Sequence, residues 1–169
     1  MSAVMSESKL DLLTAASKAE IDQWVAKYPA DKKQSATMPA LRIVQDQNEG
    51  YLTQDLMDAI AEYLGIPAIS VYEVATFYSM YEHKPVGKHK ICVCTNVSCM
   101  LRGSDEIVAH LKKKINVNGW REVSADGRFS LKEVECLGAC AGAPMMQIGR
   151  EYHENLTPEK IDKILESLD

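Results

Sequence analysis

The sequence predicts an α+β protein, in which a helical bundle is followed by a smaller segment of strands and helices. Apolar residues recur at helical spacing through residues 17–84, and from residue 88 onward they occur in short β-rich runs between two amphipathic helices. Pro85 and Gly87 mark the boundary between these patterns. We therefore expect three parts: a loose or partly helical lead at residues 1–16, a helical domain at 17–84 and an α/β domain at 85–169.

Four helices are expected in the helical domain. Ser17 and Glu20 have the spacing of a capping box, so the first helix should begin at Ser17 and end near Tyr28, before a proline. The others are expected at residues 38–48, at 54–64 behind a Thr53 cap, and at 68–78. The last helix is expected to bury one side, formed by Val71, Val74, Ala75 and Tyr78.

The α/β domain is expected to run strand, helix, three strands and helix, which suggests a small sheet covered by two helices. Strands are expected at residues 90–94, at 129–135 with alternating burial, and in a hairpin of 145–148 and 151–153. Ser104 is expected to cap the first helix, and Thr157 begins the last one.

Composition and charge exclude several classes of protein. The first residues have no basic n-region and no long apolar h-region, so we expect no secretory signal. No apolar run approaches the roughly 18 residues that span a bilayer. Residues 1–84 carry a net charge of −5 and the remainder a net charge of zero, so neither half has the basic excess that phosphate backbones require. We expect a cytoplasmic chain that binds no nucleic acid and does not itself enter the membrane.

Four cysteines form two pairs, Cys94-x4-Cys99 and Cys136-x3-Cys140. The first pair sits where a strand passes into a loop, and the second lies in a loop of small residues. A [2Fe-2S] cluster needs four thiolates, two for each iron, and backbone N–H groups near the sulfurs help to set its potential. The pattern favours one such cluster on these four residues. Backbone dipoles and Arg102 would then offset the negative charge of the cluster.

Other uses of these cysteines are weighed against the cluster. Structural zinc more often uses Cys-x2-Cys knuckles, and a thioredoxin-type dithiol requires Cys-x-x-Cys; neither spacing occurs. Inert core thiols remain an alternative, but four of them in two loop pairs would be a coincidence. The fifth cysteine, Cys92, is expected to be a buried structural thiol on the strand face that Cys94 shares.

No complete active site is expected on this chain. The sequence has no nucleotide-binding fingerprint and no catalytic set of serine, histidine and acid, and His83, His89, His110 and His153 are scattered along it. A one-electron cluster without a substrate site must exchange electrons with another protein.

The segments Cys94-Thr-Asn-Val-Ser-Cys99 and Glu135-Cys-Leu-Gly-Ala-Cys140 resemble the E-subunit family of bacterial NADH:quinone oxidoreductase, respiratory complex I. The upstream run from Gly65 to Tyr78 and the segment Ala40–Gly50 are similar to that family as well. The resemblance covers roughly residues 35–169, in the same order and spacing.

The resemblance implies a thioredoxin-like [2Fe-2S] ferredoxin domain behind the helical region, with Cys94, Cys99, Cys136 and Cys140 as the ligands of the iron. It implies that the chain is an oxidoreductase subunit and that this subunit passes electrons to and from a partner binding FMN and NADH. It also implies further partner subunits in a peripheral arm on the cytoplasmic side of the inner membrane.

Two expectations stay open within that resemblance. Residues 74–81, Val-Ala-Thr-Phe-Tyr-Ser-Met-Tyr, are expected mainly to fill a core, and part of the run is expected to pack on the flavin subunit. The same module would also serve an NAD-linked hydrogenase or formate dehydrogenase.

Two other classes of function compete. A zinc-stabilised interaction module is one. A helix-turn-helix regulator is disfavoured, because Tyr51–Tyr81 contains no lysine or arginine.

Overall fold

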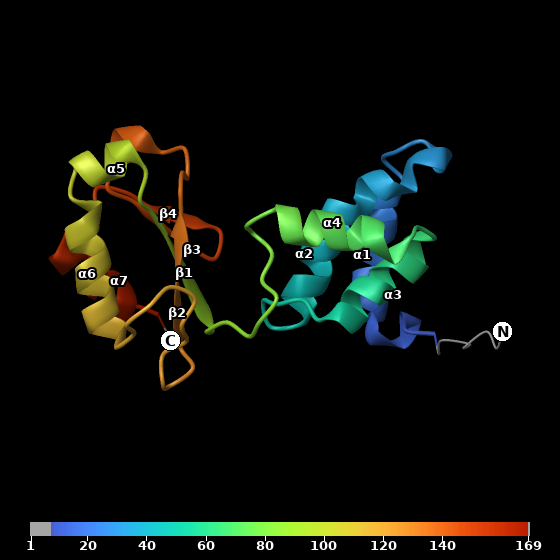
Figure 1. Cartoon of the computed structure of the whole chain (residues 1–169), viewed down its shortest axis with the longest axis horizontal. Helices are drawn as coiled ribbons and strands as arrows, with labels where there is room; N and C mark the ends of the chain where they lie inside the picture. The colour runs from blue at the N-terminus through green and yellow to red at the C-terminus, as the bar shows by residue number, and fades with distance from the viewer. Residues whose placement is uncertain (1–7, 169) are drawn as a thin grey trace. The chain divides into compact units, whose positions relative to one another are not determined.

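The computed structural model of the chain describes residues 8–168, so residues 1–7 of the expected lead lie outside the described part (Figure 1). The chain divides into two compact units, Met1–Pro85 and Val86–Asp169. Each unit has a hydrophobic core of its own. No helix within residues 8–168 has the length and apolar character needed to cross a membrane.

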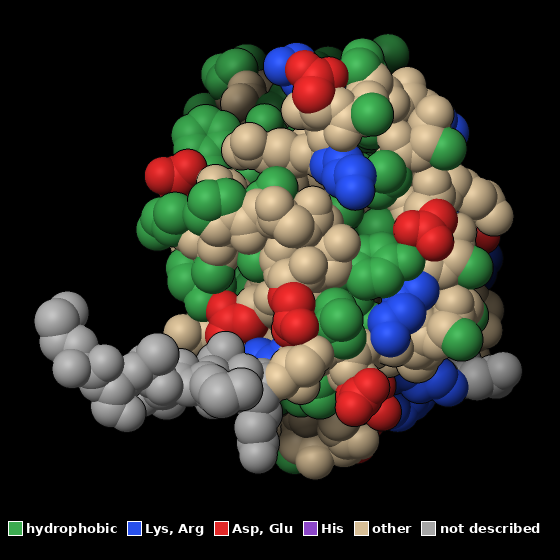
Figure 2. Space-filling model, turned by 90° about the vertical axis from the view of Figure 1, so that its right-hand side faces the viewer, with side chains coloured by type: hydrophobic (Ala, Val, Ile, Leu, Met, Phe, Trp, Pro, Cys, Tyr) green, Lys and Arg blue, Asp and Glu red, His purple; other side chains and the backbone are tan. Residues whose placement is uncertain are grey.

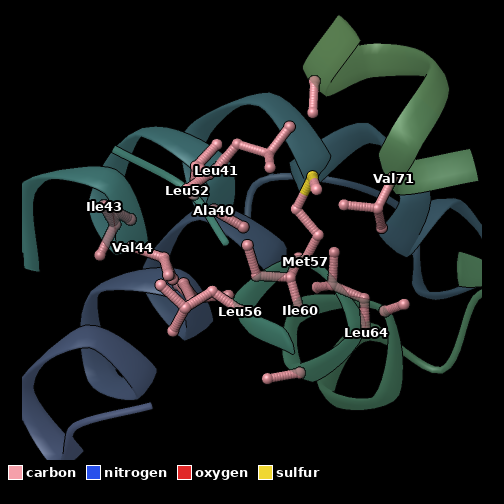
Figure 3. Packing of buried hydrophobic residues seen from close by; sticks show 14 of the residues in the cluster. Ala40, Leu41, Ile43, Val44, Leu52, Leu56, Met57, Ile60, Leu64 and Val71 are labelled. Carbon is pink, nitrogen blue, oxygen red and sulfur yellow. The ribbon is translucent and has the colours of Figure 1, made fainter. Parts of the chain in front are cut away.

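The first unit contains the four expected helices: α1 (Ala15–Val25), α2 (Thr37–Gln47), α3 (Gln54–Leu64) and α4 (Ala68–Phe77). A 3₁₀ segment, η1 (Leu10–Leu12), lies in the lead, for which partly helical structure was one of the expectations. A second 3₁₀ segment, η2 (Ala30–Ala36), was not predicted. Figure 3 shows side chains of α2, α3 and α4 packed together, and the cluster includes Leu41, Val44, Leu56, Ile60, Leu64 and Val71. Gly65 ends α3 in the left-handed conformation, with φ of 68°.

The start of α1 differs from the predicted capping box at Ser17. Thr14 caps this helix instead: its backbone is extended, and its side-chain oxygen accepts a hydrogen bond from the Ser17 N–H at 3.1 Å. Ser17 therefore lies inside the first turn. Both residues are good caps, and the burial of Leu13 and Ile21 on either side selects the earlier one.

The described end of the lead contacts α3. Lys9 Nζ lies 2.6 Å from Asp55 Oδ1 and 2.6 Å from Asp58 Oδ2. The Ser8 hydroxyl donates to Glu62 Oε1 at 2.7 Å. These contacts join η1 and the residues before it to the helical unit.

The end of α4 also differs from expectation. The helix stops at Phe77, and Tyr78 is extended. Val71 and Ala75 are fully buried, Val74 is half-buried, and Tyr78 is 38% exposed rather than buried. Phe77 is 80% exposed and Met80 is 48% exposed, so of the aromatic run only Tyr81 contributes a buried ring to the core.

The second unit has the predicted order of strands and long helices. A four-stranded sheet has the order β2-β1-β3-β4, in which β1 pairs in parallel with β2 and antiparallel with β3. The strands are β1 (His89–Cys94), β2 (Phe129–Val134), β3 (Met146–Ile148) and β4 (Glu151–His153). The hairpin of β3 and β4 across Gly149 is confirmed.

Helices α6 (Ser104–Ile115) and α7 (Pro158–Glu166) cover one face of this sheet (Figure 1). Side chains at alternate positions of β1 and β2 meet both helices in one core: Ile91, Val93, Leu131, Ile107, Leu111, Ile161 and Leu165. Two short segments were not predicted, α5 (Val97–Leu101) and η3 (Cys140–Gly142).

Two expectations for this unit are wrong in detail. Gly103, with φ of 93°, occupies the cap of α6, and Ser104 is its first helical residue, fully buried. In β2 the expected alternation is absent: Phe129, Ser130, Leu131 and Lys132 are all buried, because both faces of the strand are covered over this stretch.

Candidate metal centre

The parallel pairing of β1 and β2 brings both cysteine pairs to one end of the sheet. Cys94 is the last residue of β1 and lies opposite Val134, the last residue of β2. Parallel strands end at the same edge, so Cys136 follows two residues beyond the edge at which Cys94 lies. The Cys94 thiol donates to the Glu135 carbonyl oxygen at 3.8 Å.

The unpredicted helix α5 positions Cys99. Asn96 is its cap, and the Asn96 side-chain oxygen accepts from the Val97 N–H at 2.8 Å. The turn of helix then directs Cys99 inward, where it is 1% exposed beside Cys94 at 2%. The asparagine before a short apolar run was a cap signal that sequence reasoning passed over.

The second cysteine pair lies on a loop that packs onto the first. Leu137 and Ala139 contact the cluster of buried residues that contains Cys94 and Cys99. The Tyr152 hydroxyl of β4 donates to the Leu137 carbonyl oxygen at 2.9 Å. Cys136 and Cys140 themselves are exposed. The candidate centre therefore has a buried side and a side that faces solvent.

Gly142 keeps this loop close to the C-terminal part of the unit. A Cβ placed on Gly142 would lie 1.8 Å from Glu154 Oε2 and 2.6 Å from Glu154 Cβ. The Asn155 N–H donates to the Gly142 carbonyl oxygen at 2.6 Å. No signal in the sequence identified this close approach, because Glu154 lies beyond the intervening hairpin.

Arg102 joins the two halves of the centre. It follows α5, and its Nη1 donates to the Ala141 carbonyl oxygen at 3.1 Å. Ala141 lies in η3, directly after Cys140. The contact places a guanidinium between the helix that carries Cys99 and the loop that carries Cys140.

The buried thiols influence one another. Burial, the hydrogen bond with Cys94 and the charges of Cys94 and Cys140 together raise the pKa of the Cys99 thiol to about 11, against a backbone hydrogen bond with Met145 that lowers it. Cys94 and Cys99 lie in the same buried cluster, which explains why their thiols influence each other. A bound metal must displace the proton of such a thiol, so metal binding would release protons.

The donor set suits a [2Fe-2S] cluster. Four thiols are arranged as two pairs at one sheet edge, and their loops are uncharged and rich in small residues that leave backbone N–H groups accessible. Within residues 8–168 no three side chains of Cys, His, Asp or Glu are gathered around a single ion position. A binuclear cluster needs only two protein ligands at each iron.

The remaining candidate residues lie apart from this centre. Cys92 sits in the middle of β1, opposite Lys132 and Gln147, and is half-buried rather than buried. His110 Nε2 lies 2.8 Å from Asp162 Oδ1 and links α6 with α7. His83 Nε2 lies 3.0 Å from the Ala75 carbonyl oxygen. Both of these histidines make structural contacts away from the thiols.

A sequence profile of the thioredoxin-like [2Fe-2S] ferredoxins matches residues 21–169. The chain belongs to this family. The thioredoxin-like fold expected from the resemblance is thereby confirmed for the α/β unit of this family member.

Several relatives of this ferredoxin are E subunits of NADH-quinone oxidoreductases. The NADH-quinone oxidoreductase E subunit of Rickettsia bellii (strain RML369-C) is 47% identical over 144 residues, which are 85% of this chain and 86% of the relative. The corresponding E subunit of Rickettsia conorii (strain ATCC VR-613 / Malish 7) is 45% identical over 147 residues, 87% of each chain. The E 2 subunit of Rhizobium meliloti (strain 1021) is 43% identical over 148 residues, 88% of this chain and 86% of the relative.

A solved structure shares the fold. An NAD+-reducing [NiFe]-hydrogenase in the air-oxidized state superposes with a TM-score of 0.63 at 20% identity, over 75% of this chain. The H2-reduced state gives a TM-score of 0.64 over 76% of this chain. This ferredoxin spans only 22% of either hydrogenase chain, so the likeness concerns the fold.

Proposed function

We propose that this ferredoxin is the [2Fe-2S] electron-transfer component in the NADH-oxidising module of an NADH-quinone oxidoreductase. The observation that carries the proposal is the meeting of two cysteine pairs at the end of two parallel strands. The relatives from NADH-quinone oxidoreductases, matched over most of both chains, support the choice of host enzyme.

In this proposal Cys94, Cys99, Cys136 and Cys140 hold the two irons. A bound [2Fe-2S] cluster supplies a site that takes up and releases one electron at a time. Cys94 and Cys99 exclude water from one side of the centre because they are buried, and Leu137 and Ala139 close over them. Cys136 and Cys140 present the other side to a partner.

The partner in this proposal is the subunit that binds FMN and NADH, and electrons pass singly between its flavin and the iron of this chain. The helix α5, which carries Cys99, also carries three exposed apolar side chains, Val97, Met100 and Leu101, with exposures of 56%, 49% and 78%. Exposed apolar side chains next to the thiol site suit close contact with another protein, which electron transfer requires.

The end of α4 offers a second contact surface for the assembled enzyme. Phe77, Tyr78 and Met80 are exposed side by side in the sequence, and Phe77 packs edge-on against Tyr78 with ring centroids 5.0 Å apart. This favours the partner role of the run over the core role. We place the chain with further subunits in a peripheral arm on the cytoplasmic side of the inner membrane.

The hydrogenase likeness supports a second candidate, the same module in an NAD-linked hydrogenase. At 20% identity the likeness carries less weight than the relatives from NADH-quinone oxidoreductases. Co-purification from the native source decides between the two hosts, because the accompanying subunits differ.

Metal analysis tests the proposal directly. The chain is purified without oxygen, iron, zinc and acid-labile sulfide are assayed, and the EPR spectrum is recorded after reduction with dithionite. About two irons and two sulfides with an S = 1/2 signal are expected. One zinc without sulfide would refute electron transfer and leave a zinc-stabilised interaction module.

A further inference from the structure

The two stretches that carry the candidate ligands contain almost no charge. Residues 94–104 and 136–144 include a single charged side chain, Arg102. A cluster with four thiolates carries a net charge of about −2 when oxidised and gains one more negative charge on reduction. The charge of a nearby side chain therefore acts more strongly on the reduced state than on the oxidised one.

Arg102 is bonded to both ligand-bearing segments. Its backbone N–H donates to the Cys99 carbonyl oxygen at 3.1 Å, at the end of α5. Its guanidinium donates to the Ala141 carbonyl oxygen at 3.1 Å, one residue after Cys140. The position of the positive charge is therefore defined by the same two segments that hold the sulfur atoms.

The guanidinium keeps its charge under all conditions in which the protein is folded, because arginine is not deprotonated in proteins. Arg102 is exposed, and the two stretches themselves hold no acidic side chain. Two acidic residues border them, Glu135 directly before Cys136 and Glu154, whose carboxylate lies against Gly142. Arg102 is the one positive charge within the stretches. A fixed charge within a Debye length of about 8 Å still acts on its neighbours at physiological salt.

We propose that Arg102 is a positioning residue that sets the reduction potential of the centre, by holding one positive charge between Cys99 and Cys140. Reduction adds one electron from an external donor and forms or breaks no bond, and the fixed charge stabilises the added electron. The inference rests on the proposed function, since it requires the iron-sulfur cluster.

A purely structural role predicts different behaviour. If Arg102 acted only as a clip between α5 and η3, any variant that broke the hydrogen bond to Ala141 would loosen the loop and lower iron retention. Its effect on the potential would not depend on the charge of the replacement or on salt. The two roles are therefore separable by charge.

The test uses the full chain loaded with iron and sulfide, and the reduction potential is measured by EPR-monitored titration. Arg102→Met and Arg102→Gln remove the charge, and Arg102→Lys retains it. We expect the neutral variants to be three- to tenfold harder to reduce, which is roughly 30–60 mV more negative at 59 mV per tenfold for one electron. Arg102→Lys should stay close to the wild type.

Arg128→Met is the matched control. The Arg128 guanidinium also donates to a backbone carbonyl oxygen, that of Leu168, at 2.6 Å. It precedes β2, whose six residues at about 3.3 Å each separate it by roughly 20 Å from the cysteine end of the sheet. Arg128→Met should leave the potential unchanged.

The outcomes separate this inference from the proposed function. Wild-type protein without iron and sulfide would refute the function itself. A potential of the neutral variants equal to that of the wild type, or an equal shift in Arg102→Lys, would overturn the role of Arg102 alone. If both neutral variants lose their iron while Arg102→Lys and Arg128→Met keep it, the role in setting the potential is likewise overturned.

Salt provides a further test of the charge mechanism. A difference in reduction potential between Arg102→Gln and the wild type that shrinks at 1 M salt supports this mechanism, because the Debye length falls to about 3 Å.

Discussion

At the scale of single residues, Cys92 and Cys94 are chemically identical and differ only in position. Both lie in β1, but Cys94 is at its end, next to Cys99 and the 136–140 loop, whereas Cys92 pairs with Lys132 and Gln147 inside the sheet. The position of each cysteine relative to the end of β1 thus decides whether its thiol lies at the candidate metal centre.

A pair of substitutions tests this difference. Cys94→Ala is expected to lose most of the bound iron and sulfide, because one iron then lacks a ligand. Cys92→Ala should keep about two irons and the EPR signal of the wild type. Iron content and EPR after identical reconstitution provide the measurement. Full retention of iron in Cys94→Ala would contradict the ligand assignment.

Gly142 is a residue whose lack of a side chain is required. An added Cβ would overlap Glu154, so Gly142→Ala should displace the loop that carries Cys140. We expect a loss of about 1–3 kcal/mol in the free energy of unfolding and weaker iron retention. Chemical denaturation and iron release to a chelator measure both effects. Combining it with Glu154→Gly removes the overlapping Cβ and should restore stability; no restoration would argue against the steric cause.

At the scale of elements, α6 and α7 are joined by a polar contact above their shared core. His110 Nε2 lies 2.8 Å from Asp162 Oδ1, and Lys114 Nζ lies 3.2 Å from the same oxygen. The hydrogen bond with His110, assisted by Lys114, lowers the pKa of Asp162. The contact therefore favours the charged carboxylate in the folded protein.

This shift predicts a pH dependence of stability. A carboxyl group with a lowered folded pKa stabilises the protein above its unfolded pKa of about 3.9, and the contribution is lost as the pH falls through the folded pKa. Asp162→Asn should therefore unfold at lower urea concentration than the wild type at pH 7, and the difference should shrink as the pH is lowered from 5 to 3. Glu166→Gln, at the end of the same helix, is the control. A difference that persists unchanged at pH 3 would contradict the prediction.

The end of α4 is an element whose apolar side chains point to solvent. Phe77→Asp should change the free energy of unfolding by no more than about 0.5 kcal/mol, because Phe77 is 80% exposed. It should weaken co-purification with the proposed flavin-binding subunit, because in that interface Phe77 would be a buried aromatic side chain. Leu12→Asp, at a side chain 44% exposed on η1, is the matched control. Undiminished co-purification of Phe77→Asp would remove this surface from the interface.

At the scale of the whole molecule, the centre belongs to one unit. The four candidate ligands, Arg102, Gly142 and Glu154 all lie in Val86–Asp169, which has its own core.

The face of the molecule in Figure 2 shows hydrophobic, acidic and basic side chains interspersed, without a single-sign patch. This agrees with the absence of a basic excess in the sequence.

The division of the chain into two compact units leads to a prediction for a fragment of residues 86–169. The fragment should take up about two irons and give the EPR signal of the full chain, because it contains every contact described for the thiols. Iron, sulfide and EPR assays of fragment and full chain provide the comparison. A fragment that stays folded by circular dichroism yet binds no iron would show that the helical unit is needed for loading.

Much of this protein could be predicted from local patterns. The spacing of apolar residues, together with residues that end helices such as Gly65, located the long helices and strands to within a few residues. The spacing of the cysteines and the family resemblance identified the candidate ligands. Both are local features, since helix caps, turns and strand periodicity depend on residues near in sequence. The misplaced caps at Ser17 and Ser104 arose where a second residue one to three positions earlier, Thr14 or Gly103, could also serve as a cap, and packing chose between them.

The tertiary structure alone decided how the parts of the centre meet. The parallel register of β1 with β2 brings Cys94 and Cys136 to one edge, and the turn of α5 buries Cys99. The contact of Arg102 with Ala141 and the close approach of Gly142 to Glu154 join segments that no local pattern relates. Sequence patterns therefore identified the candidate ligands, whereas long-range packing determined their burial, their neighbours and the contact of Arg102 with their loop.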